Sequence, residues 1–97
     1  MAKGRDRERR WIVLGTDGRH VTLGRHSDPT EEEVLAAERS LSANGLAGWL
    51  AVMEGDYYAR RGRPGLMMVR PLAAPTGAFK DAAAAFEAAR ARTLQPA

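Results

Sequence analysis

The clearest structural signal in this 97-residue chain is the stretch RRWIVLGTDGRHVTLGRH, residues 9–26. Two runs rich in apolar and β-branched residues, 9–16 and 19–26, flank the dipeptide Asp17-Gly18. That dipeptide is typical of type I′ turns, which require a positive φ at both central positions. In the second run apolar and polar side chains alternate, with Val21 and Leu23 on one face and His20 on the other. We expect the apolar face to lie on a core and the face of His20 to lie in solvent. The stretch therefore predicts a β-hairpin.

The signals of an amphipathic helix follow directly after the hairpin. Asp28 stands where an N-cap is expected, and Glu31 lies at the spacing of a capping box. Apolar residues then recur at helical intervals, and Asn44-Gly45 supplies a left-handed stop. We therefore expect a helix from about residue 29 to residue 43.

The second half of the chain repeats the order strand, strand, helix. Residues 47–54 are apolar on both faces, as in a central strand that is covered on both sides. A long polar connection over residues 57–65 precedes a fourth strand at residues 66–72. Residues 77–93 then show helical spacing, with four consecutive alanines that favour a helix and permit close packing. The charged residues of this helix are expected on its other faces: Lys80, Asp81, Glu87, Arg90 and Arg92.

These elements predict an α+β fold of order β-β-α-β-β-α in one domain, residues 11–97. We expect a two-layer sandwich in which a four-stranded, largely antiparallel sheet carries both helices on one face. A short similarity between WIVL at residues 11–14 and WLAV at residues 49–52 suggests the hypothesis that one ββα unit is duplicated. Residues 1–10 are charged and lack periodicity, so we expect them to form a disordered tail.

Charge and composition narrow the function classes. The chain has 15 basic and 12 acidic side chains, a net charge of +3 and a pI near 10.0. Residues 1–10 hold five of the basic and two of the acidic side chains, so residues 11–97 carry no net charge. The absence of cysteine excludes disulfides, thiolate metal sites and cysteine nucleophiles. No apolar run approaches the length of a membrane helix, so we expect a soluble, cytoplasmic protein.

Catalytic and metal chemistry find little support in the sequence. The two histidines, His20 and His26, lie on one predicted strand with Cα atoms ~20 Å apart, too far to share one metal. No nucleophile elbow or phosphate-binding loop occurs. We therefore expect no metal, no cofactor and no enzymatic activity. A small-molecule-binding or enzymatic domain, with its ligand between sheet and helices, stays an open alternative.

Nucleic-acid binding is the first alternative function. The predicted loop places tyrosines beside arginines, and this combination suits single-stranded RNA or DNA because bases stack on aromatic rings while guanidinium groups contact phosphates. The basic tail provides a second contact for a polyanion. The candidate contact residues are Tyr57, Tyr58, Arg60, Arg61 and Arg63.

Protein–protein association is the function that we favour, with a homodimer as one form of it. The fourth strand is apolar on both faces, and if it lies at the sheet edge it can pair with a second copy. The candidate interface residues are Leu66, Met67, Met68 and Val69. We expect Trp49 and Met68 to lie in the core and leave the place of Met67 open. The chain is thus predicted to be a small, non-enzymatic interaction module that binds another protein or itself.

Overall fold

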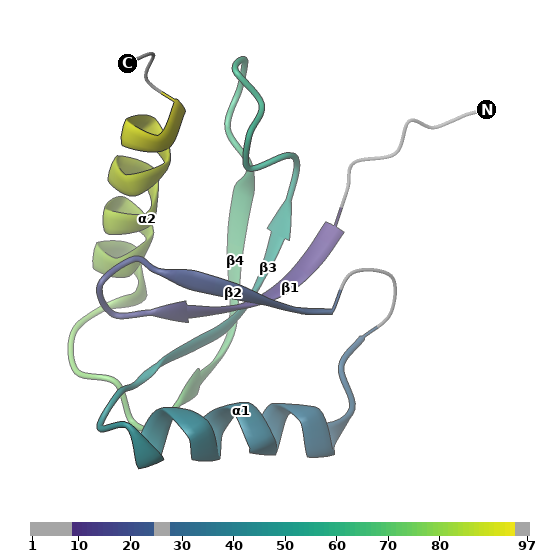
Figure 1. Ribbon diagram of the computed structural model, residues 1–97, viewed down its shortest axis with the longest axis vertical. Coiled ribbons are helices and arrows are strands. Elements are labelled where there is room, and N and C mark those ends of the chain that lie inside the picture. Colours follow the sequence, from purple (N-terminus) through teal and green to yellow (C-terminus); the bar gives the residue numbers. More distant parts are fainter. Residues whose placement is uncertain (1–8, 25–27, 95–97) are drawn as a thin grey trace.

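The computed structural model describes residues 9–24 and 28–94 as four strands and two helices (Figure 1). In chain order they are β1 (Arg9–Gly15), β2 (His20–Gly24), α1 (Glu31–Ala43), β3 (Gly48–Glu54), β4 (Gly65–Leu72) and α2 (Phe79–Leu94). The strands form one sheet in the order β2-β1-β3-β4, and every neighbouring pair is antiparallel. The predicted α+β class, element order and antiparallel sheet are confirmed.

β1 begins earlier than the predicted domain boundary. Arg9 and Arg10 pair with Glu54 and Met53 of β3, so the prediction of a tail that runs to residue 10 is wrong for its last two residues. The rest of that predicted tail lies outside the described residues. Twelve basic and ten acidic side chains belong to the chain from residue 9 onward, which therefore carries a net charge of +2.

The β1–β2 hairpin has a longer turn than the sequence predicts. The Gly18 N–H donates to the Gly15 carbonyl at 3.0 Å, and the Gly15 N–H donates to the Arg19 carbonyl at 2.7 Å. Gly18 has a φ of 88°, whereas Asp17 keeps a negative φ. The connection is thus a three-residue loop with glycine in its left-handed position, which is the next most common hairpin geometry after the two-residue turn. The predicted type I′ turn is wrong, although the hairpin itself is confirmed.

α1 starts after Thr30 instead of after Asp28. The Thr30 hydroxyl accepts from the Glu33 N–H at 3.1 Å, and the Glu33 carboxylate accepts from the Thr30 N–H at 2.8 Å. This is a complete capping box, shifted by two residues from the predicted one. Asp28 instead accepts a hydrogen bond from the Trp11 indole N–H at 3.1 Å, so it links the helix entry to β1.

The two helices lie on opposite faces of the sheet. Ile12 and Leu14 of β1 belong to the core cluster that contains Phe86 of α2. Val13, which lies between them and points the other way, belongs to the cluster that contains Val34 of α1. The prediction that both helices cover one face is therefore wrong, and the molecule has three layers: α1, the sheet and α2. We call the two sides of the sheet the α1 face and the α2 face.

The residues of β3 explain why both faces are covered. All residues from Gly48 to Met53 are buried, with Trp49 in the α2-face cluster and Leu50 in the α1-face cluster. A strand that is apolar on both faces requires a cover on each. Figure 1 shows the two helices that provide these covers: α2 runs alongside the sheet, and α1 crosses its lower end.

The two ββα halves are not a structural repeat. A two-fold axis that relates the antiparallel central strands β1 and β3 must stand perpendicular to the sheet, and such an axis keeps both helices on one face. Here the helices lie on opposite faces. The matching tryptophans also diverge, since Trp11 packs on the α1 face and Trp49 on the α2 face. The hypothesis of a ββα duplication is therefore wrong for the structure.

Candidate functional site

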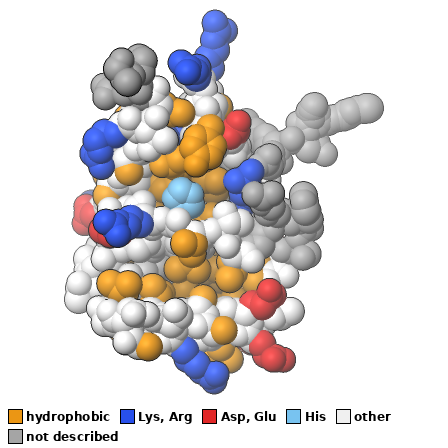
Figure 2. All heavy atoms as spheres, in the orientation of Figure 1, with side chains coloured by type: hydrophobic (Ala, Val, Ile, Leu, Met, Phe, Trp, Pro, Cys, Tyr) orange, Lys and Arg blue, Asp and Glu red, His pale blue; other side chains and the backbone are white. Residues whose placement is uncertain are grey.

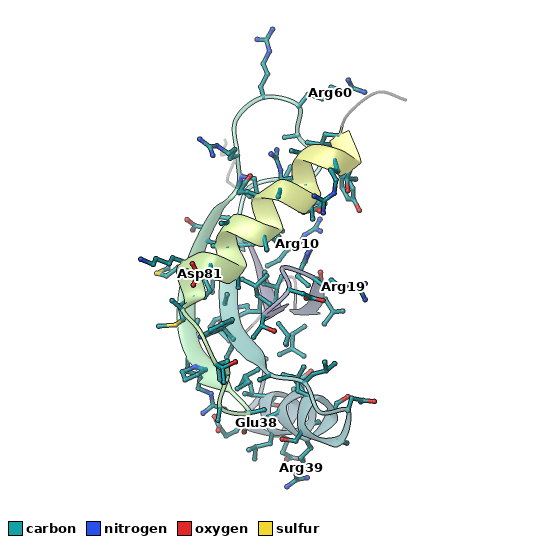
Figure 3. The ribbon with its side chains drawn as sticks, turned by 90° about the vertical axis from the view of Figure 1, so that its left-hand side faces the viewer. Arg10, Arg19, Glu38, Arg39, Arg60 and Asp81 are labelled. Carbon is teal, nitrogen blue, oxygen red and sulfur yellow. The ribbon has the colours of Figure 1, made fainter. Side chains whose placement is uncertain are left out.

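β4 forms one edge of the sheet, and three consecutive apolar side chains along it are exposed. Met67, Met68 and Val69 are 57%, 47% and 42% exposed. Methionine sulfur atoms project beside this strand at the left of Figure 3. The sequence predicted an interface on the fourth strand if that strand lies at a sheet edge. β4 does lie at an edge.

The side chains of the β4 edge divide between the two faces of the sheet. Met67 pairs with Val52 on the α1 face, whereas Leu66 and Met68 pair with Met53 and Ala51 on the α2 face.

Only part of the predicted interface is free for a partner. Leu66 is half-buried and packs against the α2-face core, so the exposed surface consists of Met67, Met68 and Val69. The expectation of a core position is correct for Trp49, which is 4% exposed, and wrong for Met68. Met68 differs because it lies on the outermost strand, whereas Trp49 lies on a central strand with a neighbour on each side.

The second half of β4 is irregular. Val69 is the extra residue of a bulge opposite β3. Arg70 follows, with its Nη2 3.7 Å from Oε2 of Glu31 on α1, and Pro71 has no N–H to donate. Bulges, charges and prolines are the features by which natural proteins protect sheet edges. The first half of the strand, residues 65–68, has none of them.

A strained turn follows β4 and is held by α1. Ala73 and Ala74 have φ angles of 58° and 48°, a conformation that costs non-glycine residues on the order of 1 kcal/mol each. The Ala73 N–H donates to Oε2 of Glu38 at 2.8 Å. This charge-assisted hydrogen bond fixes the point at which the chain leaves the sheet edge.

The loop at the other end of β4 is held by a buried arginine. Arg90 of α2 is 6% exposed. Its Nε donates to the Tyr57 carbonyl at 2.8 Å, and its Nη2 donates to the carbonyls of Ala59 and Gly62 at 2.6 and 3.1 Å. Three backbone acceptors of the loop thus converge on one side chain.

The charged residues of α2 are predicted to lie away from its apolar stripe, and this is wrong for Arg90. Arg90 lies four residues after Phe86 and eight after Ala82, so it continues the buried stripe of α2. That spacing is the signal that identifies it. The partner carbonyls, in contrast, belong to an irregular loop and leave no pattern in the sequence.

The five predicted nucleic-acid contacts lie on this loop, and they differ in exposure. The Tyr57 ring is half-buried, with its centroid 5.3 Å from Phe86 and 4.9 Å from His20. Tyr58 is 64% exposed. The loop arginines Arg60, Arg61 and Arg63 are all exposed, and Figure 3 shows Arg60 at the loop tip.

Acidic side chains accompany these arginines. Glu54 and Asp56 line, together with Arg61 and Arg63, an open hollow of about 220 Å³. The loop surface is therefore of mixed charge instead of uniformly positive. Tyr57 is engaged in packing, so only Tyr58 is free to stack on a base. Nucleic-acid binding by this loop stays a prediction.

The opposite sheet edge, β2, borders a broad groove. This groove has a volume of about 740 Å³ and runs from the hairpin turn between α1 and α2, with His20 at the centre of the face in Figure 2. Apolar side chains surround that histidine in the same view. The side chains of the groove that lie outside the hairpin turn are those of Val13, His20, Val21, Leu41, Leu46, Ala47, Tyr57 and Ala89.

His20 is a packing residue of this edge. Its ring centroid lies 4.9 Å from Tyr57 and 5.0 Å from Phe86. Burial lowers the pKa of His20 below its ordinary value of 6.5, and the positive charge of Arg10 lowers it further. The alternation predicts a core position for Val21 and a solvent position for His20, and both are wrong, since Val21 is 64% exposed. His26 lies outside the described residues.

The described residues, 9–24 and 28–94, contain no cluster of metal-ligating side chains and no helix that is long and apolar enough to cross a membrane. No family model, no curated protein and no solved structure matches the chain.

Proposed function

We propose that this chain is a protein-interaction module that binds its partner by strand addition at the β4 edge. The observation that carries the proposal is an eight-residue edge strand on which Met67, Met68 and Val69 are exposed side by side. An edge strand presents unpaired backbone donors and acceptors along one side, and an extended partner segment satisfies them.

Apolar burial adds to the backbone pairing. Met67 and Met68 lie on opposite faces of the sheet, so an added strand covers one with each row of its side chains. Complete burial of a methionine contributes about 1.5–3 kcal/mol, so a half-exposed one contributes about 1 kcal/mol. Methionine also adapts its shape to irregular partner surfaces.

The features of the strand locate the contact in its first half. The bulge at Val69 and the missing N–H of Pro71 interrupt pairing toward the carboxyl end. A partner strand therefore pairs mainly with residues 65–68, where the edge is regular.

A strand-like peptide tests this function directly. The probe is a fluorescein-labelled peptide with the sequence of residues 65–72 and two added lysines for solubility, and its anisotropy is measured at protein concentrations at which the chain is monomeric. We expect saturable binding, weakened about fivefold by Met67→Lys because that variant loses about 1 kcal/mol of apolar burial.

The matched control is Val21→Lys on the other edge strand. Val21 is 64% exposed and Met67 is 57% exposed, and both point to the α1 face. The control is expected to leave the peptide affinity unchanged. Absence of binding, or binding that Val21→Lys weakens and Met67→Lys does not, contradicts the proposed function.

A further inference from the structure

We propose that the strand that completes the β4 edge is β4 of a second copy of this chain, paired antiparallel about Met67. The inference rests on the proposed strand addition and names its partner. The result is a symmetric dimer with one continuous eight-stranded sheet, in which the two copies of Met67 face each other across the two-fold axis.

The faces of the side chains fix this register. Opposite residues of an antiparallel pair point to the same face of a sheet. Met67 points to the α1 face, and Leu66 and Met68 point to the α2 face. Antiparallel pairing centred on Met67 sets each Leu66 opposite Met68 of the other copy. Every apolar side chain of the regular half of β4 then meets an apolar side chain on its own face.

The bulge places the charged residue of β4 where it meets an opposite charge of the second copy. Because Val69 is an extra residue, both it and Arg70 lie opposite Gly65 of the second copy in this register. Arg70 is the sole charged residue of β4, and no like charge faces it. In the next strand Gly65 pairs with Glu54, which is exposed and shares the face of Arg70. Arg70 of one copy thus lies across a glycine from Glu54 of the other, and opposite charges meet on this face.

A second charge complementarity lies at the ends of the paired strands. The register places the loop before one β4 beside the turn after the other. The loop carries Arg63, two residues before β4, and that turn is held by Glu38 through the Ala73 N–H. The antiparallel arrangement therefore brings Arg63 of each copy toward the turn that Glu38 holds in the other. Parallel pairing instead brings the two arginine loops together.

Charge substitution at Met67 tests both the partner and the register. Because residue 67 faces itself, Met67→Lys places two lysines opposite each other, and Met67→Glu places two glutamates opposite each other. Like charges in directly opposite positions destabilise strand pairing. We expect each variant alone to weaken the dimer at least tenfold in sedimentation equilibrium, and an equimolar mixture of the two to restore a dimer of one copy each.

The control pair is Val21→Lys with Val21→Glu, which is expected to leave the dimer unchanged alone and mixed. A single cysteine provides an independent readout, because the chain has none of its own. Met67→Cys is expected to cross-link to a second Met67→Cys with a short bismaleimide, and Val21→Cys is not. Melting curves check that each variant is folded.

The outcomes separate this proposal from the proposed function. A chain that stays monomeric at millimolar concentration, yet binds the β4 peptide in a manner sensitive to Met67→Lys, overturns the second copy and leaves strand addition standing. A dimer that the Met67 variants weaken but their mixture does not restore overturns the register. A dimer insensitive to Met67 in a chain that binds no peptide overturns both.

Discussion

The two edges of the sheet expose apolar side chains to a similar degree but differ in almost every other respect. Val21 on β2 is 64% exposed and Met67 on β4 is 57% exposed. β2 has five residues and follows a turn that packs directly on α2, whereas β4 has eight residues. The first half of β4 is regular and bears no charge. Exposure alone therefore does not identify a binding edge, because the length and regularity of the free backbone also decide what can pair with it.

The contacts behind the two edges are also different. The β2 edge is tied to α2 through the hairpin turn and His20. The β4 edge is held at its two ends, by Arg90 on the loop before it and by Glu38 on the turn after it. We infer that α2 fixes the start of the β2 edge in place, while the middle of β4 stays open to a partner.

Gly18→Ala, in the turn before β2, is expected to have the largest effect on the free energy of unfolding. A Cβ at this position lies 2.6 Å from backbone atoms of Ala85 and Phe86, and φ is +88°. We expect a loss of about 3 kcal/mol or more in the free energy of unfolding, measured with urea, because helix backbone cannot yield as a side chain does. The control is Gly77→Ala, with a φ of +89° and no atom within 4 Å. It is expected to cost about 1 kcal/mol, and equal losses for the two variants contradict direct packing of the turn on α2.

The next largest effect concerns the loop before β4. Arg90→Leu removes the donors to the carbonyls of Tyr57, Ala59 and Gly62, and unpaired buried acceptors cost about 1–3 kcal/mol. We expect a loss of about 2 kcal/mol in the free energy of unfolding and faster amide exchange over residues 57–64. Arg92→Leu, an exposed position on the same helix, is expected to change neither. Unaltered amide exchange over residues 57–64 in Arg90→Leu contradicts the claim that Arg90 holds this loop.

The smallest expected effect is a dependence of stability on pH, which we assign to His20 on the β2 edge and not to the β4 edge. The pKa of His20 is lowered in the folded chain by burial and by Arg10, so the unfolded chain binds the proton first as pH falls. The free energy of unfolding therefore decreases as pH drops below the ordinary value of 6.5. We expect His20→Phe to reduce this dependence of the urea midpoint. Dimer affinity, which depends on β4, is expected to stay constant over the same range, and a parallel loss of affinity contradicts the separation of the edges.

Local patterns in the sequence predict the elements of this fold but not their arrangement. The strand pattern around Asp17-Gly18 predicts the hairpin, and Asn44-Gly45 predicts the end of α1; the structure confirms both. The sides on which the helices pack are a long-range property. The two apolar faces of residues 47–54 do indicate a cover on each side, and this observation argues against the predicted two-layer sandwich.

The candidate site was predictable to a smaller extent. Met67 and Val69 are visible as large apolar residues in a strand, but their exposure depends on β4 lying outside β3. That order follows from the pairing of β1 with β3, which are more than thirty residues apart in the chain. Arg90 could be assigned to the buried stripe of α2 from its spacing, whereas its carbonyl partners depend on a loop conformation that no local pattern encodes.

The central claim, that β4 is the pairing edge, is tested most directly by sedimentation equilibrium of the wild-type chain beside Met67→Lys, Met67→Glu and their equimolar mixture. We predict a wild-type dimer, two weakened variants and a restored dimer in the mixture, with no effect of the corresponding changes at Val21. A dimer that depends on Val21 and is indifferent to Met67 contradicts the account, because it places the pairing at β2.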